Sequence, residues 1–350
     1  MRTQATLYTH AASRRAGLFG FNFGRRALVA LAAAVLTATA ASAQDSSSDN
    51  PSHYPNRPIR MIVPTTAGSP TDVMARLVAQ SLSTTIGQPA LVENRPGGGG
   101  IIGTKGVVGA DPDGYTLLFT EGAKHLMTPA LYDNVGFDPV KDLTPVATAG
   151  GGIFVLVVAS DVPAKSVQEL VAYARANPGK INFGFGQGTL PHILGASLKA
   201  SSGVDIASIP YKGGSQAVAD MLGGHIQMNF GTTATLLPLI RQGRLRALAV
   251  TGEARDRDLP DVPTMTESGY PALTLRYWMA VWGPPHLPAP IVEKLNSHVI
   301  AGLKSPELAA GMAKAGFDTL PIAASAMADF VASESPKWLA VAKSSGVRGN

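Results

Sequence analysis

The sequence contains no cysteine, and this absence excludes disulfide bonds, thiolate-bound metal sites and a cysteine nucleophile together. It also has no G-x-S-x-G elbow and no H-E-x-x-H motif, and its seven histidines are scattered without metal-like spacing. We therefore predict a protein that is not an enzyme and that uses no metal and no cofactor. A hydrolase of small esters or amides, with a triad assembled only in space, stays open as the alternative.

Long hydrophobic runs are also lacking, because no apolar stretch reaches the roughly 20 residues that span a bilayer. The short run Ala27–Leu36 follows the basic pair Arg25-Arg26 and precedes the small residues Ala41-Ser42-Ala43. This order is typical of a secretory signal peptide, residues 1–43, cleaved near Ala43. We therefore expect a soluble periplasmic protein; the sequence leaves open whether export uses the general or the twin-arginine route.

The excess of positive charge belongs to the signal segment. The whole chain has 29 Lys and Arg against 24 Asp and Glu, but five of the arginines lie in residues 1–43, which contain no acidic residue. The remainder therefore carries no net charge, and neither nucleic acid nor an anionic membrane is expected as a partner. Its 307 residues favour two domains, after a flexible lead-in at residues 44–56.

Short β-branched or leucine-rich runs alternate with longer helical patterns from Arg57 onward. The first pair is the strand pattern Ile59–Val63 and the helical pattern Asp72–Ile86, and a second series runs from Phe154 to Thr251. Three helical patterns follow Pro290. Repeated strand-then-helix order predicts parallel sheets in an α/β architecture.

Two loops combine small residues, hydroxyl groups and a helix start directly after a strand. Free backbone N–H groups and the positive end of a helix dipole suit a carboxylate there, so we predict ligand binding at both loops. Helix capping alone explains the first pattern equally well, and a structural role explains the single histidine of the second. The candidate residues are Thr65, Thr66, Gly68, Ser69, Thr71 and Asp72 in the first loop, and Gly186, Gly188, Thr189 and His192 in the second.

A glycine-rich run offers a competing interpretation. Gly98–Gly103 satisfies G-x-G-x-x-G, and Glu121 lies at the distance of a ribose ligand in a dinucleotide fold. However, residues Glu93–Pro96 separate the preceding strand from the glycines, whereas a dinucleotide site needs the turn directly after the strand. We therefore do not predict a dinucleotide site.

The chain resembles the receptors of tripartite tricarboxylate transporters, also called the Bug extracytoplasmic solute receptors, over nearly its whole length after the signal. The resemblance is carried by short stretches in a fixed order. They are Tyr54-Pro55, Arg57–Arg60, Ile62–Pro64, Thr71-Asp72, Ala75-Arg76, Gly87–Pro89, Val92–Gly97, Asp113–Leu118, Asn134–Asp142, Pro210–Gly213, Gly243–Thr251 and Leu259–Thr264.

The resemblance implies a two-lobed periplasmic binding protein fold of the second topological type, in which each lobe is a mixed, mostly parallel sheet flanked by helices. We place lobe 1 at residues 57–152 and 278–350 and lobe 2 at residues 153–277, with hinges near Ile153–Ser160 and Leu273–Tyr277. Such receptors close on one small ligand, often a carboxylate, and deliver it to a separate membrane permease. They are usually monomers. A receptor that serves a signalling partner rather than a permease stays open as a further alternative.

In similar receptors the ligand carboxylate is held by the loop after the first strand and by a glycine-rich loop of the other lobe. By position these are Thr65–Asp72 and Gly186–His192. Two departures from the family pattern concern the ligand. Hydroxyl-bearing residues replace the usual Pro- and Gly-rich run before Thr71, and Gly231 stands where the family often has an acid that meets a ligand amine. We therefore include Gly231 among the ligand-binding residues and expect an organic acid without an amine.

Overall fold

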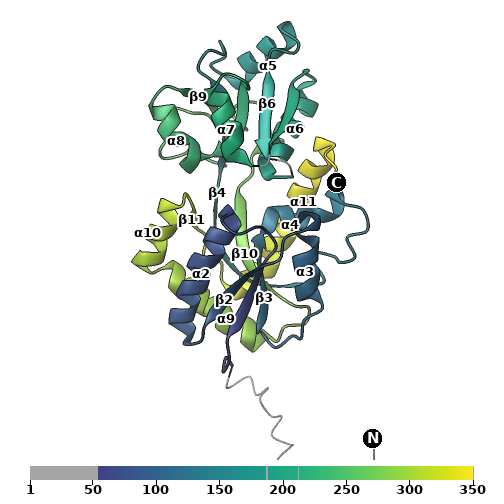
Figure 1. Ribbon diagram of the computed structural model, residues 1–350, viewed down its shortest axis with the longest axis vertical. Coiled ribbons are helices and arrows are strands. Elements are labelled where there is room, and N and C mark those ends of the chain that lie inside the picture. Colours follow the sequence, from purple (N-terminus) through teal and green to yellow (C-terminus); the bar gives the residue numbers. More distant parts are fainter. Residues whose placement is uncertain (1–53, 187, 212, 350) are drawn as a thin grey trace, which may run out of the picture. The chain divides into compact units, whose positions relative to one another are not determined.

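The computed structural model describes residues 54–349, apart from residues 187 and 212 and the side chain of residue 234 (Figure 1). The predicted signal peptide and most of the predicted lead-in lie outside the described residues. The described chain starts within the fold, because Tyr54 is only 5% exposed and its hydroxyl donates to the carbonyl oxygen of Gly114 (2.8 Å). Residues 54–56 therefore belong to the folded unit rather than to the lead-in.

The first sheet has six strands in the described residues, in the order β11-β4-β10-β3-β1-β2. β1 lies between β2 and β3 and is parallel to both. β10 pairs antiparallel with β3 and β4, and β11 pairs antiparallel with β4. The bounds are β1 Ile59–Val63, β2 Ala90–Asn94, β3 Thr116–Glu121, β4 Thr144–Gly152, β10 Tyr277–Gly283 and β11 Asp318–Thr319.

Helices cover both faces of this sheet. Ile59, Met61 and Val63 of β1 are fully buried on one face, and Ile62 is fully buried on the other. Burial on both faces explains why the sequences of these strands are continuous runs of apolar residues. No helix of the described residues is long and apolar enough to cross a membrane. The helices are α2 Pro70–Ile86, α9 Ala289–Leu303 and α10 Pro306–Lys314 on the first face, and α3 Ile101–Val108, α4 Gly122–Leu131 and α11 Ala324–Ser345 on the second.

The second sheet repeats this arrangement with five strands in the described residues, in the order β7-β6-β8-β5-β9. Its strand β6 lies between β7 and β8 and is parallel to both, as β1 is to its neighbours. The bounds are β5 Phe154–Ala159, β6 Asn182–Gly186, β7 Ala207–Tyr211, β8 Met228–Thr232 and β9 Leu245–Val250, with α5 Val167–Ala176, α6 Leu190–Ser202, α7 Gly214–Leu222 and α8 Thr233–Arg241.

The chain passes between the sheets through extended segments. Ile153 is the single residue between β4 and β5, and the return leads through the short 3-10 helix Pro271–Leu273 into β10 (Figure 1). The last helix connects the two halves as well, because α11 packs against both α4 and α6. The Ser197 hydroxyl of α6 donates to the carbonyl oxygen of Val341 in α11 (3.2 Å).

The predicted α/β architecture of two mixed sheets is confirmed, but the sheets are not mostly parallel. Two of the five neighbouring strand pairs in the first sheet are parallel, and two of the four in the second. The physical reason is that the strands leading from one sheet to the other, β4, β5 and β10, run antiparallel to the strands of the βα units. Local strand-then-helix order in the sequence reveals only the βα units.

Candidate ligand-binding site

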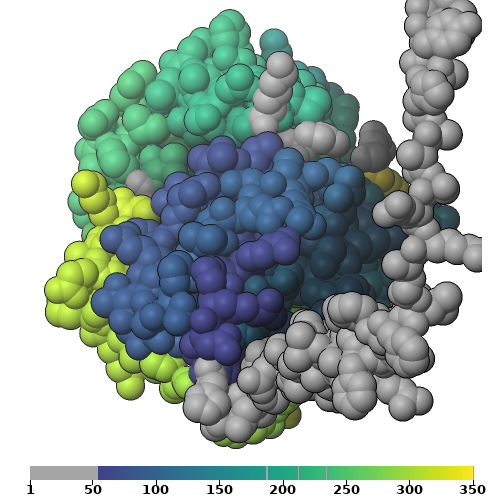
Figure 2. Space-filling model, turned by 60° about the horizontal axis from the view of Figure 1, so that its bottom comes forward, coloured from purple at the N-terminus to yellow at the C-terminus, as the bar shows by residue number. Residues whose placement is uncertain are grey.

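The strand order reverses at β1 in the first sheet and at β6 in the second. In open α/β sheets, ligands bind beyond the carboxyl ends of the strands at such a reversal. The loop Thr65–Asp72 follows β1, and the loop Gly186–His192 follows β6. Figure 2 shows the purple-to-blue surface of the first sheet's early segments adjoining the green surface of the second sheet's segments. The topology therefore selects the same two loops as the sequence.

The first loop is held by its own hydroxyl groups. The hydroxyls of Thr65 and Ser69 lie 2.7 Å apart, and the Ser69 hydroxyl accepts from the backbone N–H of Asp72 (3.2 Å) as the N-cap of α2. Gly68 has φ +78°, a left-handed conformation that favours glycine. Ser69 therefore caps α2, as the capping interpretation predicted, and its hydrogen bonds fix the loop in front of the helix.

Asp72 is committed to contacts within the protein. Its carboxylate accepts from the N–H of Gly68 (2.8 Å), from the Asn94 amide (2.9 Å) and from the Arg76 guanidinium (3.0 Å), and its side chain is 3% exposed. Burial alone would raise the pKa of Asp72, but the bonds from Arg76, Gly68 and Asn94 outweigh burial and hold the pKa below its usual value. The structure therefore assigns Asp72 to holding the loop.

Thr71 is the group of this loop that is best placed for a ligand. Its side chain is 7% exposed, and its hydroxyl makes no hydrogen bond to any described residue. Its oxygen is not fully enclosed by protein, so a ligand oxygen can replace water as its hydrogen-bond partner. Thr66 and Gly68 are exposed at the tip of the loop.

The second loop presents helix donors without a side-chain cap. Thr189 is the N-cap of α6, but its hydroxyl donates to the carbonyl oxygen of Gly186 (2.8 Å) instead of accepting from the helix. Pro191 has no N–H, so the N–H groups of Leu190 and His192 remain as uncapped donors. Gly188 has φ +70° and open space around it. This helix start suits an anion.

The imidazole of His192 is turned toward another cavity. Its ring stacks on Phe185 at 3.9 Å with the planes 4° apart, and its Nδ1 is buried without a partner in the described residues. Burial lowers the pKa of His192, so the ring is neutral at pH 7. It lines a cavity of about 460 Å³ with Lys199 and Arg348. Any contact of His192 with a carboxylate at the start of α6 therefore uses the backbone N–H of His192 rather than its imidazole ring.

Gly231 lies level with Gly186, because β6 and β8 are parallel with Phe183 opposite Met228. A Cβ at position 231 would come within 2.5 Å of Leu236 and 3.3 Å of the Asn229 amide oxygen. The space that an acidic side chain needs is therefore filled by Leu236, which explains the glycine in packing terms.

In the sequence, Glu121 stood out only as a candidate ribose ligand. It is the last residue of β3 and the N-cap of α4, and its side chain does not cap the helix. Burial raises the pKa of Glu121 to about 7, against a smaller lowering by Lys124. An acid at the junction of an apolar strand pattern and a helix was the signal available in the sequence.

The glycine-rich run has a packing role. A Cβ at Gly99, where φ is +65°, would lie 2.1 Å from the Tyr132 hydroxyl, and a Cβ at Gly103 would lie 2.8 Å from the Arg95 carbonyl oxygen. Both glycines allow α3 and the turn before it to approach their neighbours closely. Close packing accounts for these glycines without a bound phosphate.

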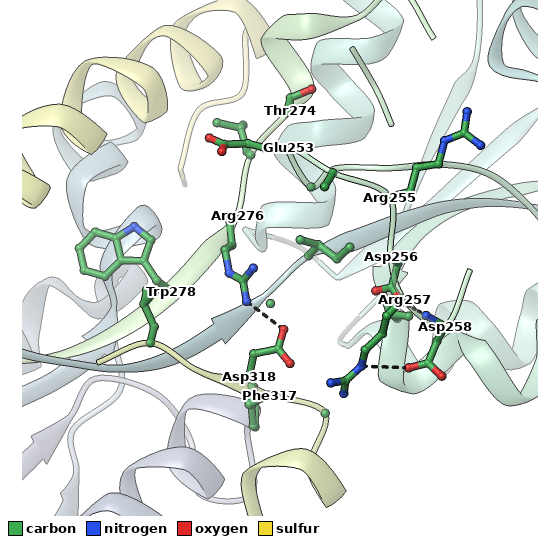
Figure 3. Close-up of a pocket in the computed structure, with 18 of the residues that line it drawn as sticks. Glu253, Arg255, Asp256, Arg257, Asp258, Thr274, Arg276, Trp278, Phe317 and Asp318 are labelled. Atoms are coloured by element: carbon green, nitrogen blue, oxygen red, sulfur yellow. Dashed lines mark hydrogen bonds and ion pairs between the residues drawn. The ribbon is translucent and has the colours of Figure 1, made fainter. Parts of the chain in front are cut away.

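A cavity of about 750 Å³ opens beside the segments that connect the sheets, and none of the predicted binding residues lines it (Figure 3). Its charged side chains largely pair with one another, as Arg276 with Asp318 (2.8 Å) and Arg257 with Asp258 (3.6 Å). Arg255 pairs with Glu267 (3.0 Å). Most of the charges that line this cavity are therefore paired within the protein.

The profile of the family described as the tripartite tricarboxylate transporter family receptor matches residues 74–347. The chain belongs to this family. It is 35% identical to protein BugT of Bordetella pertussis over 316 residues, which are 90% of this chain and 96% of BugT. The receptor is thus a solute-binding protein and not an enzyme.

Solved structures agree with this fold. The periplasmic binding protein BugD superposes with a TM-score of 0.70 at 36% identity, over 84% of this chain and 99% of that chain. MatC of Rhodopseudomonas palustris, solved with bound malate, gives a TM-score of 0.71 at 28% identity, over 83% and 100%. A second R. palustris protein, solved with adipate, gives 0.72 at 32% identity, over 84% and 99%.

Proposed function

We propose that the protein is an exported receptor that binds a small organic acid between the loops after β1 and β6. The observation that carries the proposal is the pair of unsatisfied donors at the two strand-order reversals. Thr71 offers a hydroxyl without a partner among the described residues on the first sheet, and the start of α6 offers uncapped N–H groups on the second. Donors of this kind are the usual partners of a carboxylate. The malate and adipate bound by two relatives support the same ligand class.

We further propose that binding stabilises a closed form of two lobes, residues 57–152 with 278–350 and residues 153–277. The chain crosses at Ile153 and again at Leu273–Tyr277, and three glycines, residues 150–152, precede the first crossing. Few side chains resist rotation at such a crossing, and a ligand that touches both lobes favours closure by its extra contacts there.

We infer that the signal segment, residues 1–43, sends the receptor to the periplasm, where it acts as a monomer. The family description and the periplasmic relatives support this placement. Delivery would then be to a separately encoded membrane permease of the tripartite tricarboxylate type.

The test is a thermal-shift screen of the protein without its first 43 residues against mono-, di- and tricarboxylates, with malate and adipate among them. A ligand that binds only the folded form at a hundredfold excess over its Kd stabilises by about 2.7 kcal/mol. We expect a selective shift for at least one acid, weakened by Thr71→Val and by Thr189→Val. Thr84→Val, on the exposed side of α2, is the matched control and leaves the shift unchanged.

The outcomes separate this proposal from its rivals. Turnover of the bound acid's ester or amide, followed by mass spectrometry, would identify a hydrolase. A bound acid whose uptake persists after gene removal would favour a signalling receptor. The absence of any shift, together with no co-purified acid in native mass spectrometry, would refute the ligand class.

A further inference from the structure

The Tyr277 hydroxyl at the start of β10 is buried without a partner. The side chain is 2% exposed, and its oxygen has no hydrogen bond to any described residue. A Cβ at residue 152 would lie 2.7 Å from this oxygen, so Gly152 leaves the space that the hydroxyl occupies. Buried polar groups are almost always satisfied, and an exception calls for a partner that binds there.

The carboxyl of Glu121 lies on the same face of the first sheet. Glu121 is paired with Met279 across the β3–β10 ladder, and Tyr277 is two residues from Met279, so the three side chains share a face. Glu121 makes no hydrogen bond to any described residue, yet its side chain keeps partial exposure. Two polar groups without partners therefore lie side by side at this edge.

This edge is continuous with the candidate site. β1 and β3 are parallel with Ile62 opposite Leu118, and three residues further on they reach Thr65 and Glu121. The strand-order reversal at β1 lies between these two strands. Glu121 thus occupies in the first sheet the place that Gly231 occupies in the second, at the end of the strand next to the reversal.

We propose that Glu121, as the neutral acid, and Tyr277 together donate hydrogen bonds to an acceptor oxygen at the far end of the bound organic acid. The end with the first carboxylate is held by Thr71 and the start of α6. The proposal rests on the proposed function. It makes the receptor selective for dicarboxylates over monocarboxylates of equal length, and it couples binding to the uptake of up to one proton from solvent.

The charges around Glu121 favour its neutral form. Burial raises its pKa to about 7, and the nearest cation, Lys124 on α4, only partly offsets burial. Burial also raises the pKa of Tyr277, and Glu121 and Asp318 raise it further, while Arg276 lowers it. On α2, Asp72 and Arg76 neutralise each other. A second ligand carboxylate next to Glu121 adds a like charge and removes water, and both effects favour the protonated carboxyl.

The experiment uses three chain-matched probes, hexanoate, adipate and 6-aminohexanoate, with the shorter series butyrate, succinate and 4-aminobutyrate. Isothermal titration in two buffers of different ionisation enthalpy counts the protons taken up with each probe. We expect a dicarboxylate of one series to bind at least about tenfold more tightly than its monocarboxylate. Between the pKa values of free and bound Glu121, affinity falls by up to tenfold for each unit of rising pH.

Conservative variants separate the contributions of Glu121 and Tyr277 to dicarboxylate affinity and proton uptake. Glu121→Gln keeps a hydrogen-bond donor but cannot titrate, so it retains dicarboxylate binding while proton uptake and the pH slope of affinity disappear. Tyr277→Phe removes one donor and weakens dicarboxylates about fivefold, with monocarboxylates unchanged. Glu293→Gln, on the exposed side of α9, is the matched control and keeps both the affinity and the slope.

Each other outcome overturns the proposal. If 6-aminohexanoate or 4-aminobutyrate bound more tightly than the matching dicarboxylate and released a proton, Glu121 would be the anionic partner of an ammonium group. Monocarboxylates that bind as tightly as dicarboxylates, or a slope that persists in Glu121→Gln, would reject the role of Glu121 while the organic-acid receptor stands. No binding by any probe or by the wider panel of carboxylates would reject both.

Discussion

Replacing Asp72 by Asn tests whether this carboxylate holds the loop or touches the ligand. Three partners converge on it, the Gly68 N–H, the Asn94 amide and the Arg76 guanidinium. An Asn side chain keeps one acceptor oxygen and introduces an NH2 group. That group faces the Asn94 amide, which is itself a donor at this contact. Asn94 cannot reverse its amide without cost, because its oxygen accepts from Arg76 (3.1 Å).

The expected loss of stability follows from these contacts. A hydrogen bond to a charged group contributes about 1.5–3 kcal/mol, and the bond to the Gly68 N–H and the bond to Asn94 are of this kind. The Arg76 side chain is 53% exposed, so its ion pair adds less than about 1 kcal/mol. Since Asn retains part of one bond, we expect Asp72→Asn to lower the free energy of unfolding by about 2–3 kcal/mol.

Urea unfolding followed by tryptophan fluorescence measures this change at pH 7 and near pH 3. A carboxyl whose folded pKa is lowered contributes stability above its unfolded pKa and loses it as pH falls through the folded value. The difference between wild type and Asp72→Asn must therefore shrink in acid. Asp161→Asn, at an exposed position, is the control. Unchanged stability at pH 7 with a strongly reduced ligand affinity would refute our assignment and make Asp72 a ligand contact.

Three further variants test the frame around the site. His125 is 4% exposed, and burial lowers its pKa to about 4. The folded state therefore does not take up a proton that the unfolded chain binds, and the free energy of unfolding falls from pH 6.5 toward pH 4. In His125→Gln we expect this fall, measured by urea unfolding, to be smaller by about 2 kcal/mol. Gly99→Ala places a Cβ against Tyr132 in a left-handed conformation and lowers the melting temperature, with an expected loss of about 2 kcal/mol. Glu334 accepts from the indole N–H groups of both Trp278 (3.2 Å) and Trp338 (3.1 Å), and Glu334→Ala leaves both donors unpaired at a cost of about 2–4 kcal/mol in the same assay. Equal acid sensitivity in His125→Gln, or wild-type stability in either of the other two, would contradict these assignments.

Local patterns in the sequence were enough to place most helices and strands. Ser166 followed three residues later by Glu169 is a capping-box pattern, and in the structure the Ser166 hydroxyl accepts from the N–H of Glu169 (3.1 Å) at the start of α5. The apolar run Ile59–Val63 is β1 with the predicted bounds. These features depend on neighbours a few residues apart, which is why the sequence reports them. The direction of β4 and β10 depends on pairing between residues more than a hundred positions apart, and local patterns do not contain it.

The same distinction separates the two kinds of candidate residue. Thr71 and the start of α6 are visible in the sequence because each belongs to a loop between a strand and a helix. Glu121 and Tyr277 become a pair only when β3 and β10 align, with Met279 opposite Glu121. In a receptor with two sheets, the general affinity for a carboxylate can therefore reside in loops that follow the strands, while the choice among acids is made by side chains that distant strands bring together. Two relatives of similar fold were solved with different acids, malate and adipate.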